Sequence, residues 1–311
     1  MIYFYNMTTS RRWISQGWTG FRRHDTDIDC YHGYTGSDAT ADVMKNRSSH
    51  MIRVCKSAGY TGHRRLVDLQ MYTNILVNDD LKLIYCHVPR VASSTWMKTF
   101  VYARGIPPRN FDLYKASYLA AFGFRKLGDY NPEDVTKRIN SYFKFMFVRD
   151  PLVRIVSAYK NIFNLKNTNP KNDIYRKRLA RKMSKSFPKA ATKLERTGEI
   201  DFKDFVQFIV HNIKSKRQLD SPVCRISQLC LPCLIKYDAI GHLDSFREDG
   251  SYILRKMYNN SCYETFRSDS YNKTMPRYTK ADVKEFYKNI SAEDYATLKS
   301  HFAFDTRLFG L

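Results

Sequence analysis

The sequence predicts an α/β protein with a P-loop-like parallel sheet flanked by helices. Two similar stretches support this prediction. In each, a proline-containing turn ends an apolar, β-prone run, and a helix start follows. They begin at Lys82 and at Phe143. A predicted helix lies between them, and strands joined by a helical crossover run parallel in one sheet. Ligands on such sheets bind beyond the carboxyl ends of the strands, where both breaks fall.

Upstream of the first stretch, the chain divides into an arm and a folded domain. Residues 1–60 are polar, contain glycine and carry scattered Tyr and Trp, so we expect a stem-like or loosely ordered arm before a domain over 61–311. Residues 64–77 have helical apolar spacing, with Leu66, Leu69, Ile75 and Leu76 as inward candidates. Asn-Asp-Asp at 78–80 predicts the turn into the first strand.

The first stretch predicts a strand, a tight turn and a helix N-terminus. Lys82–Val88 is the strand, a Pro-Arg pair ends it, and Ser93, Ser94 and Thr95 stand where a helix would begin. The free N–H groups and dipole of a helix start favour an anion, and Arg90 adds a cation. The loop lacks the GxxxxGK pattern of nucleoside triphosphate sites. An ordinary buried strand before a capped helix would show the same pattern.

The second stretch repeats this arrangement. Phe143–Val148 predicts a strand, Asp150 can cap the following helix, and the next residue is a proline, which suits the first helical position. The inward face of the helix is then Leu152, Ile155, Val156, Tyr159, Ile162 and Phe163. Arg149, Arg154 and Ser157 are left as polar groups near its start, so a second phosphate-binding site is predicted.

The segment Lys166–Lys193 is strongly basic and poor in large apolar residues. Its cations include Arg176, Lys177, Arg178, Arg181, Lys182, Lys185 and Lys189. One interpretation is a solvated, mobile segment. The other is an arm over the ligand cleft that grips an anionic chain, and a charge run is compatible with both.

The remaining elements are predicted from caps and apolar spacing. A helix begins at Asn131-Pro132 with Val135 and Ile139 inward, and Asp201 caps an amphipathic helix. Leu234–Ile240 reads as a third strand. Two capping boxes, Thr279 with Asp282 and Ser291 with Asp294, begin two C-terminal helices.

Two motifs in these stretches resemble a known family. Val88–Trp96, VPRVASSTW, resembles the 5′-phosphosulfate loop of the Golgi carbohydrate sulfotransferases, and Phe147–Tyr159, FVRDPLVRIVSAY, resembles their 3′-phosphate motif. The most similar branch contains the chondroitin and dermatan 4-O-sulfotransferases and the HNK-1 sulfotransferase, and Gln228–Asp244 and Phe304–Gly310 also resemble it. The resemblance covers roughly residues 80–311 and is patchy between about 166 and 200.

The resemblance implies the sulfotransferase fold, 3′-phosphoadenosine 5′-phosphosulfate (PAPS) as sulfate donor and no metal. It places Arg149 and Ser157 at the 3′-phosphate. On the 5′ side it implies contacts from Arg90, Val91, Ala92, Ser93, Ser94, Thr95 and Trp96. Arg90 is then the catalytic residue, because sulfuryl transfer builds negative charge on the leaving phosphate oxygen. The family also implies a catalytic domain over 61–311, a location in the Golgi lumen and membrane association.

Two features depart from the family pattern. The family usually has lysine at the position of Arg90, and arginine keeps the charge but does not readily give up a proton. Members usually carry an N-terminal membrane anchor, and no stretch here is long and apolar enough to predict one. A second hypothesis is therefore a catalytically weak or inactive protein of this fold that binds acidic polysaccharide. A kinase-like transferase is disfavoured, because the Gly-Lys-Ser/Thr loop is missing.

The sequence leaves the catalytic base unassigned. His87, His211 and His242 are candidates by chemistry. His87 adjoins the first loop, and His242 follows a predicted strand end. For each of them alone, a structural histidine is the simpler interpretation.

The charge of the chain points to an acidic partner. With 52 Lys and Arg against 30 Asp and Glu, the net charge is +22. Nucleic acid, an anionic membrane surface and an acidic polysaccharide all fit this charge, but no RNA-binding aromatic motif or zinc-finger spacing supports nucleic acid. The resemblance narrows the acceptor to an anionic, chondroitin-like glycan, sulfated at O-4 of N-acetylgalactosamine.

The seven cysteines include at least one that is unpaired within the chain, because their number is odd. We expect Cys86, in the first strand, to be a buried thiol. Disulfides are expected among Cys224, Cys230, Cys233 and Cys262. A zinc site would need a second Cys-x-x-Cys pair, and the sequence has none. Five Asn-x-Ser/Thr sequons, at Asn6, Asn46, Asn259, Asn272 and Asn289, give modest support to a secretory route.

Overall fold

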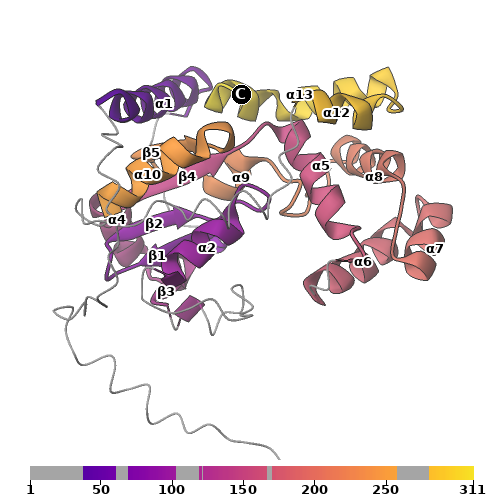
Figure 1. The fold of residues 1–311 in the computed structure, drawn as a ribbon, viewed down its shortest axis with the longest axis horizontal. Coiled ribbons are helices and arrows are strands. Elements are labelled where there is room, and N and C mark those ends of the chain that lie inside the picture. Colours follow the sequence, from indigo (N-terminus) through magenta and orange to yellow (C-terminus); the bar gives the residue numbers. More distant parts are fainter. Residues whose placement is uncertain (1–37, 61–68, 103–118, 121, 167–169, 258–279) are drawn as a thin grey trace, which may run out of the picture.

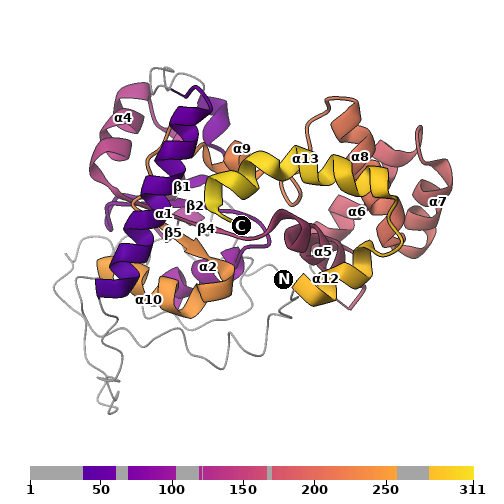
Figure 2. The ribbon, with the colours of Figure 1, turned by 90° about the horizontal axis from the view of Figure 1, so that it is seen from above.

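The computed structural model describes residues 38–60, 69–102, 119–120, 122–166, 170–257 and 280–311. Two lobes are visible (Figure 1). The sheet lobe contains a five-stranded sheet with α1, α2, α4 and α10 around it, and the helical lobe contains α5 to α8 and α12. Helix α13 runs along both lobes, which Figure 2 shows from above.

The sheet is mixed, with strands in the order β3-β1-β2-β4-β5. The strands are β1 (Ile75–Asn78), β2 (Leu83–Cys86), β3 (Phe124–Lys126), β4 (Phe143–Val148) and β5 (Ala239–His242). Neighbours β2, β4 and β5 run parallel, whereas β1 is antiparallel to β2 and to β3. The predicted α/β fold with a parallel sheet and flanking helices is confirmed, and an antiparallel pair extends the sheet at one edge.

The helices cover the sheet and build the second lobe. They are α1 (Asp38–Ser57), α2 (Ser93–Tyr102), α4 (Pro132–Ser141), α5 (Pro151–Ile162), α6 (Pro170–Met183), α7 (Pro188–Thr197), α8 (Phe202–Lys214), α9 (Ile226–Cys230), α10 (Phe246–Met257), α12 (Lys280–Tyr287) and α13 (Ala292–Phe309). The short 3₁₀ turns are η2 (Leu69–Tyr72), η3 (Leu127–Asp129) and η4 (Leu243–Ser245).

Helix α1 lies within the segment predicted to be a stem-like arm. Its Met44 and Met51 are buried, and it packs against β5, α10 and α13. Arg47 pairs with Asp249 of α10 at 2.7 Å and donates to the Ile240 carbonyl of β5 at 3.0 Å. Residues 38–57 therefore belong to the packed domain.

The helix predicted over 64–77 is wrong at its C-terminal end. Ile75–Asn78 forms β1, with all four residues buried and Ile75 paired with Cys86 across the strands. Four residues are too few to distinguish helical spacing from strand spacing in the sequence. Pairing with β2 makes this segment a strand. Residues 64–68 lie outside the described residues.

The strand after α9 begins later than predicted. Instead of Leu234–Ile240, the structure has β5 over Ala239–His242, because the Leu234 and Ile235 N–H groups both donate to the Leu231 carbonyl and form a turn. Gly241 is required inside this strand, since a Cβ there would lie 2.3 Å from the Phe147 ring.

Several predicted helix starts are confirmed by their caps. The Asp150 carboxylate accepts from the N–H groups of Leu152 and Val153 at the start of α5. Asn131 and Ser291 accept from their third following N–H groups, at 2.8 and 3.1 Å. Asp201 precedes α8 but pairs with Lys193 instead of capping. The capping box predicted at Thr279 lies outside the described residues.

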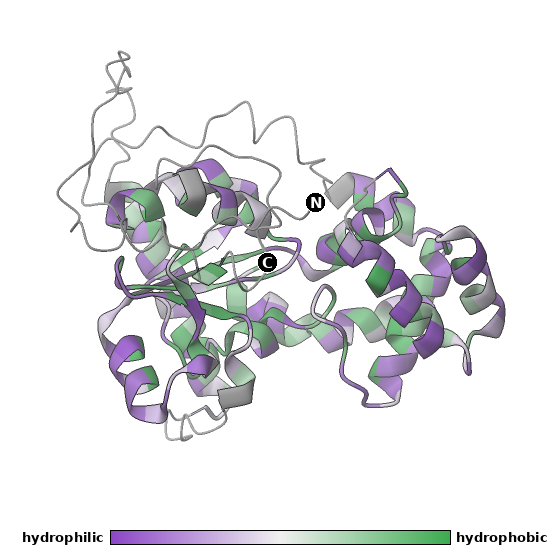
Figure 3. Cartoon of the chain, turned by 90° about the horizontal axis from the view of Figure 1, so that it is seen from below, coloured by the Kyte–Doolittle hydropathy of each residue, from purple (hydrophilic) through white to green (hydrophobic). Residues whose placement is uncertain are grey.

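An aromatic cluster fills the core between the sheet and its helices. Trp96 of α2 lies against Tyr85, Phe145 and Phe147 of the central strands and against Phe246 of α10. Figure 3 shows the corresponding hydrophobic colour along the strands and on the inward sides of the helices. Burial of this surface holds α2, and so the loop before it, at the carboxyl end of β2.

Two disulfides connect distant parts of the chain, and they correct the predicted pairing. Cys55 of α1 bonds Cys233, and Cys86 of β2 bonds Cys230 at the end of α9. Cys86 is therefore not a thiol, and Cys230 and Cys233 pair upstream instead of with each other or with Cys224, which is reduced and buried. The Cys-x-x-Cys pair is visible in the sequence but its partners are not, because they lie 144 and 178 residues away on β2 and α1.

Candidate functional site

The loop between β2 and α2 has a strained backbone. Arg90 has a φ of 69° and Ala92 a φ of 52°, both in the left-handed region that side-chain-bearing residues rarely adopt. The Trp96 N–H then donates to the Ala92 carbonyl at 3.0 Å as α2 begins. Strain of this kind persists where surrounding packing enforces it, and it clusters at ligand sites.

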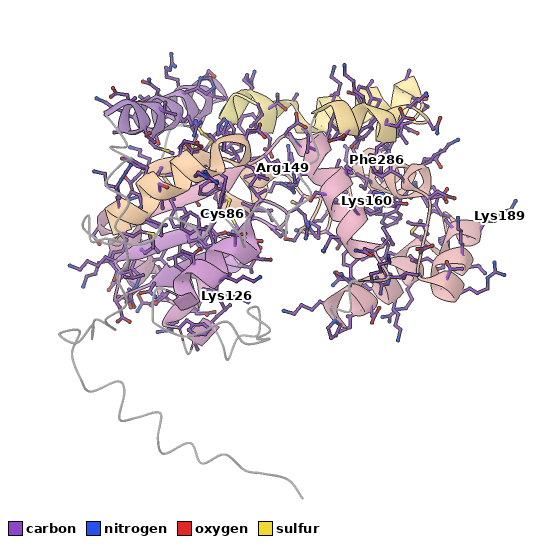
Figure 4. The ribbon with its side chains drawn as sticks, in the orientation of Figure 1. Cys86, Lys126, Arg149, Lys160, Lys189 and Phe286 are labelled. Carbon is purple, nitrogen blue, oxygen red and sulfur yellow. A yellow bond between two sulfur atoms is a disulfide. The ribbon has the colours of Figure 1, made fainter. Side chains whose placement is uncertain are left out.

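The second predicted motif meets this loop directly. The Arg90 guanidinium donates to the Ser157 hydroxyl of α5, from Nε at 3.4 Å and from Nη2 at 3.5 Å. Arg149, directly after β4, donates from Nη1 to the Arg90 carbonyl at 3.5 Å. Figure 4 shows Arg149 where the sheet lobe meets α5. The two motifs, 67 residues apart between Arg90 and Ser157, therefore form one site.

This site is suited to an anion. It joins two guanidinium groups to the N-terminal ends of α2 and α5, where helix N–H groups and dipoles attract negative charge. Arg149 and Ser157 are buried, with exposed fractions of 8% and 7%. Asp150, which follows Arg149, is engaged as the cap of α5. Two neighbouring cations, one buried and one half-buried, favour a ligand that carries phosphate or sulfate groups.

The other predicted residues of the first loop lie at different depths. Ser94 is exposed and Thr95 half-buried in the first turn of α2, whereas Ser93 is buried. Val91 and Ala92 are also buried, so their backbone groups rather than their side chains would be available to a ligand. The Trp96 indole lies in the core described above and supports the loop from beneath.

The three histidine candidates lie in different places. His211 of α8 contacts the turn between α6 and α7. His242 ends β5, where burial, with a smaller contribution from Arg47, lowers its pKa to about 4. Burial also lowers the pKa of His87 to about 4, and its ring packs edge-on to Tyr85. A pKa this low makes His87 and His242 weak bases. Of the three candidates, only His87 belongs to the segment that leads into the site loop.

Sequence reasoning missed the role of Arg154, which is buried on α5 one turn before Ser157. Its Nε donates to the Pro222 carbonyl at 3.3 Å and its Nη2 to the Cys224 carbonyl. Burial lowers its pKa to about 10, opposed by the charge of Asp305 of α13. This network fixes α5 to the chain before α9. It left no local signal, because its partners lie 68 and 70 residues away.

The basic segment is largely helical. Residues 170–183 and 188–197 form α6 and α7, which pack against each other. Arg176 is buried, donates to the Ile162 carbonyl at 2.5 Å and pairs with Asp173, so it supports the hairpin. The other predicted cations are exposed; they are Lys177, Arg178, Arg181, Lys182, Lys185 and Lys189. Lys189 extends outward at the far end of the helical lobe (Figure 4).

Two strand–loop–helix units on adjacent parallel strands, with an arginine in the loop after each strand, are typical of the class of α/β proteins that bind phosphate-bearing ligands. Comparison with known proteins makes the class specific. Residues 73–311 match the sulfotransferase family, and the chain belongs to this family. The protein is therefore a sulfotransferase, and the resemblance seen in the two motifs is confirmed.

The chain is similar to several curated carbohydrate sulfotransferases. It is 28% identical to carbohydrate sulfotransferase 11 of Rattus norvegicus over 87% of this chain and 76% of that protein. It is 28% identical to carbohydrate sulfotransferase 10 of Xenopus laevis, over 87% and 77%. With carbohydrate sulfotransferase 14 of Danio rerio the identity is 32%, over 72% and 60%. No solved structure matches the chain.

Two features are absent from the part of the chain that the structure describes. Of the helices that the structure describes, none combines the length and apolar character needed to cross a bilayer. The same described residues bring together no group of three or more His, Cys, Asp or Glu side chains that could hold a metal ion.

Proposed function

We propose that this sulfotransferase moves the sulfuryl group of PAPS to a glycan hydroxyl, with O-4 of N-acetylgalactosamine in chondroitin as the acceptor position. The observation that carries the proposal is the contact of Arg90 with Ser157 and Arg149, which unites the two phosphate motifs. The names of the similar proteins support a carbohydrate acceptor. The chondroitin position rests on the branch that the motifs resemble.

The residues of the site fit the two anionic ends of the donor. Arg149 and Ser157 supply a buried guanidinium and a hydroxyl for the 3′-phosphate. Arg90, the hydroxyls of Ser93 to Thr95 and the backbone of Val91 and Ala92 supply donors for the 5′ side. The donor contributes an activated sulfuryl group, while the protein contributes position and charge.

Arg90 has the central part in the chemistry that we propose. Its guanidinium stabilises the negative charge that develops on the leaving phosphate oxygen. Because arginine holds its proton at neutral pH, this help is electrostatic and includes no proton transfer to the leaving group. The contact with Ser157 orients the guanidinium from α5. His87 is the candidate base closest in sequence to this loop.

The acceptor is expected along the exposed side of α6. Lys177, Arg178 and Arg181 are exposed there, and the chain as a whole carries a net charge of +22. An anionic glycan would be attracted to such a surface and held largely by Coulombic contacts.

The Golgi lumen is the compartment that we propose, with membrane association as in the family. The two disulfides support it, because disulfides persist in oxidising compartments and are rare in the cytosol.

Transfer of radiolabelled sulfate from PAPS to a panel of desulfated glycans tests the proposal. Incorporation into chondroitin, mapped to O-4 by disaccharide analysis, is the expected result. Binding of glycan without any transfer would favour the alternative, an inactive polysaccharide-binding protein. Activity only on uncharged sugars or on steroid and phenolic alcohols would overturn the acceptor class.

A further inference from the structure

A pocket lies in the helical lobe, between α6, α8 and residues 217–223, which lead from α8 towards α9. Its volume is about 290 Å³. Neither Arg90, Arg149 nor Ser157 lines it, so it is separate from the donor site. This volume is at the lower end of small-molecule sites, so it suits one ring rather than a chain.

The charged side chains that line the pocket are two cations and one carboxylate. Asp220 is already engaged, because Lys182 Nζ lies 2.7 Å from its carboxylate and the Tyr175 hydroxyl donates to it at 3.2 Å. Arg217 lines the same pocket, and among the described residues no acidic side chain pairs with it. Two cations against one carboxylate give a local charge of +1.

The rest of the lining suits a sugar ring. Phe208 and Ile209 of α8 and Leu219 of the returning segment provide apolar surface, while Asn212 and Gln218 add amide groups beside it. A uronic acid presents the matching surfaces, since its ring has apolar C–H faces and its edge carries hydroxyls and one carboxylate. Guanidinium groups bind carboxylates through two parallel hydrogen bonds.

The pocket wall is tied to the donor site through α5. Pro222, within the segment that forms this wall, accepts from Arg154 Nε at 3.3 Å, and Arg154 lies one turn before Ser157 on the same helix. The exposed cations of α6 adjoin the pocket, because Lys182 belongs both to α6 and to the lining. A chain bound along α6 can therefore place one unit in the pocket.

We infer that this pocket is a subsite for an acidic sugar unit of the acceptor glycan, with Arg217 binding the carboxylate. The inference rests on the proposed function, because it takes the glycan to be the acceptor. Arg217 recognises the chain away from the reacting hydroxyl, so it contributes to acceptor affinity and not to the sulfuryl transfer itself.

The test compares Arg217→Ala with Lys45→Ala, which removes another exposed cation, from α1 in the sheet lobe. Arg217→Ala is expected to raise the KM for desulfated chondroitin roughly five- to tenfold, with kcat and donor affinity unchanged. Lys45→Ala should alter none of these. On chondroitin whose uronic carboxyls are reduced to alcohols, wild type should lose affinity and the Arg217 variant should not, so the two proteins should become alike.

Two results would overturn the subsite. One is an Arg217→Ala variant whose affinity falls as much as that of wild type when native chondroitin is replaced by carboxyl-reduced chondroitin. The other is unchanged oligosaccharide binding with lost binding of an acidic peptide, which would assign the pocket to a protein partner. Calorimetry with chondroitin oligosaccharides and no donor keeps the test independent of turnover. If no glycan is sulfated but Arg217→Ala still weakens oligosaccharide binding, the proposed function fails and the subsite stands.

Discussion

At the residue scale, the site depends on a few side chains that the fold brings together from separate motifs. Arg149 directly follows β4 and Arg90 lies in the loop after β2, and both could be identified in the sequence because strand breaks and helix caps are local signals. Their mutual contact and the burial of Arg149 come only from the pairing of β2 with β4. The contacts of Arg154 could not be predicted, since nothing in the local sequence indicates that it binds carbonyl groups near α9.

Replacement of Arg149 or Ser157 by alanine should weaken binding of the desulfated donor product, 3′-phosphoadenosine 5′-phosphate. Arg149→Ala should cost about 1.5–3 kcal/mol and Ser157→Ala about 0.5–1.5 kcal/mol, because hydrogen bonds from charged groups are the stronger kind. Isothermal titration calorimetry measures both, with Lys45→Ala as a control. Unchanged affinity in both variants would show that the 3′-phosphate binds elsewhere.

Replacement of Arg90 should separate turnover from binding. Arg90→Ala should lower kcat by about 10²–10³, as loss of a transition-state charge contact does, and should weaken product binding much less. Arg90→Lys restores the charge and should remain active. Steady-state kinetics beside calorimetry gives both quantities. An equal loss of turnover and affinity would make Arg90 an anchor of the ground state.

At the element scale, the reliability of prediction followed the strength of local signals. The bounds of β4 and the start of α5 were predicted correctly, because an apolar run is followed by Asp150-Pro151, a cap and a first helical position. β1 was predicted as helix and β5 was displaced, since both are four residues long and are defined by their neighbours in the sheet. Helices α6 and α7 were not predicted, because their many charged residues are equally typical of a solvated loop.

Neutralising the exposed face of α6 should affect the acceptor and spare the donor. We expect the triple change of Lys177, Arg178 and Arg181 to Gln to raise the acceptor KM several-fold at low salt and less at high salt, because screening already weakens these contacts. Lys182 is left intact, since its loss would leave Asp220 without its ion pair.

The matched control for this variant removes three exposed cations of α1, by changing Lys45, Arg53 and Lys56 to Gln. Both proteins then have the same net charge. KM for acceptor and donor should be measured across a salt series. If the two triple variants behave alike, general charge attraction and not the α6 surface binds the glycan.

At the scale of the whole molecule, three histidines that the fold partly buries should make the protein sensitive to acid. Burial lowers the pKa of His87, His242 and His301 from about 6.5 to about 4. Between these values the unfolded chain binds protons that the folded chain does not, so stability should fall as pH falls from about 6.5 to about 4. Thermal unfolding from pH 7.5 to 4.5 measures this. His301→Gln should flatten the curve, and a Tm independent of pH in this window would contradict the assignment.

The disulfides act on the whole molecule as well, because they join segments 178 and 144 residues apart. Loops of this length restrict the unfolded chain strongly, so removing either bond should lower the free energy of unfolding by about 2–5 kcal/mol. The paired changes Cys55→Ala with Cys233→Ala and Cys86→Ala with Cys230→Ala test this by denaturant unfolding. Cys224→Ala, which breaks no disulfide, is the control for substitution of a buried cysteine.

The two bonds should differ in their effect on the donor site. Cys86 ends β2, four residues before Arg90, whereas Cys55 lies on α1 outside the site. Loss of the Cys86–Cys230 bond should therefore weaken binding of 3′-phosphoadenosine 5′-phosphate in protein that is still folded, and loss of the Cys55–Cys233 bond should lower stability alone. Calorimetry well below each variant's Tm separates these effects. Equal affinity in both variants would mean that packing around Trp96 positions the site loop without the disulfide.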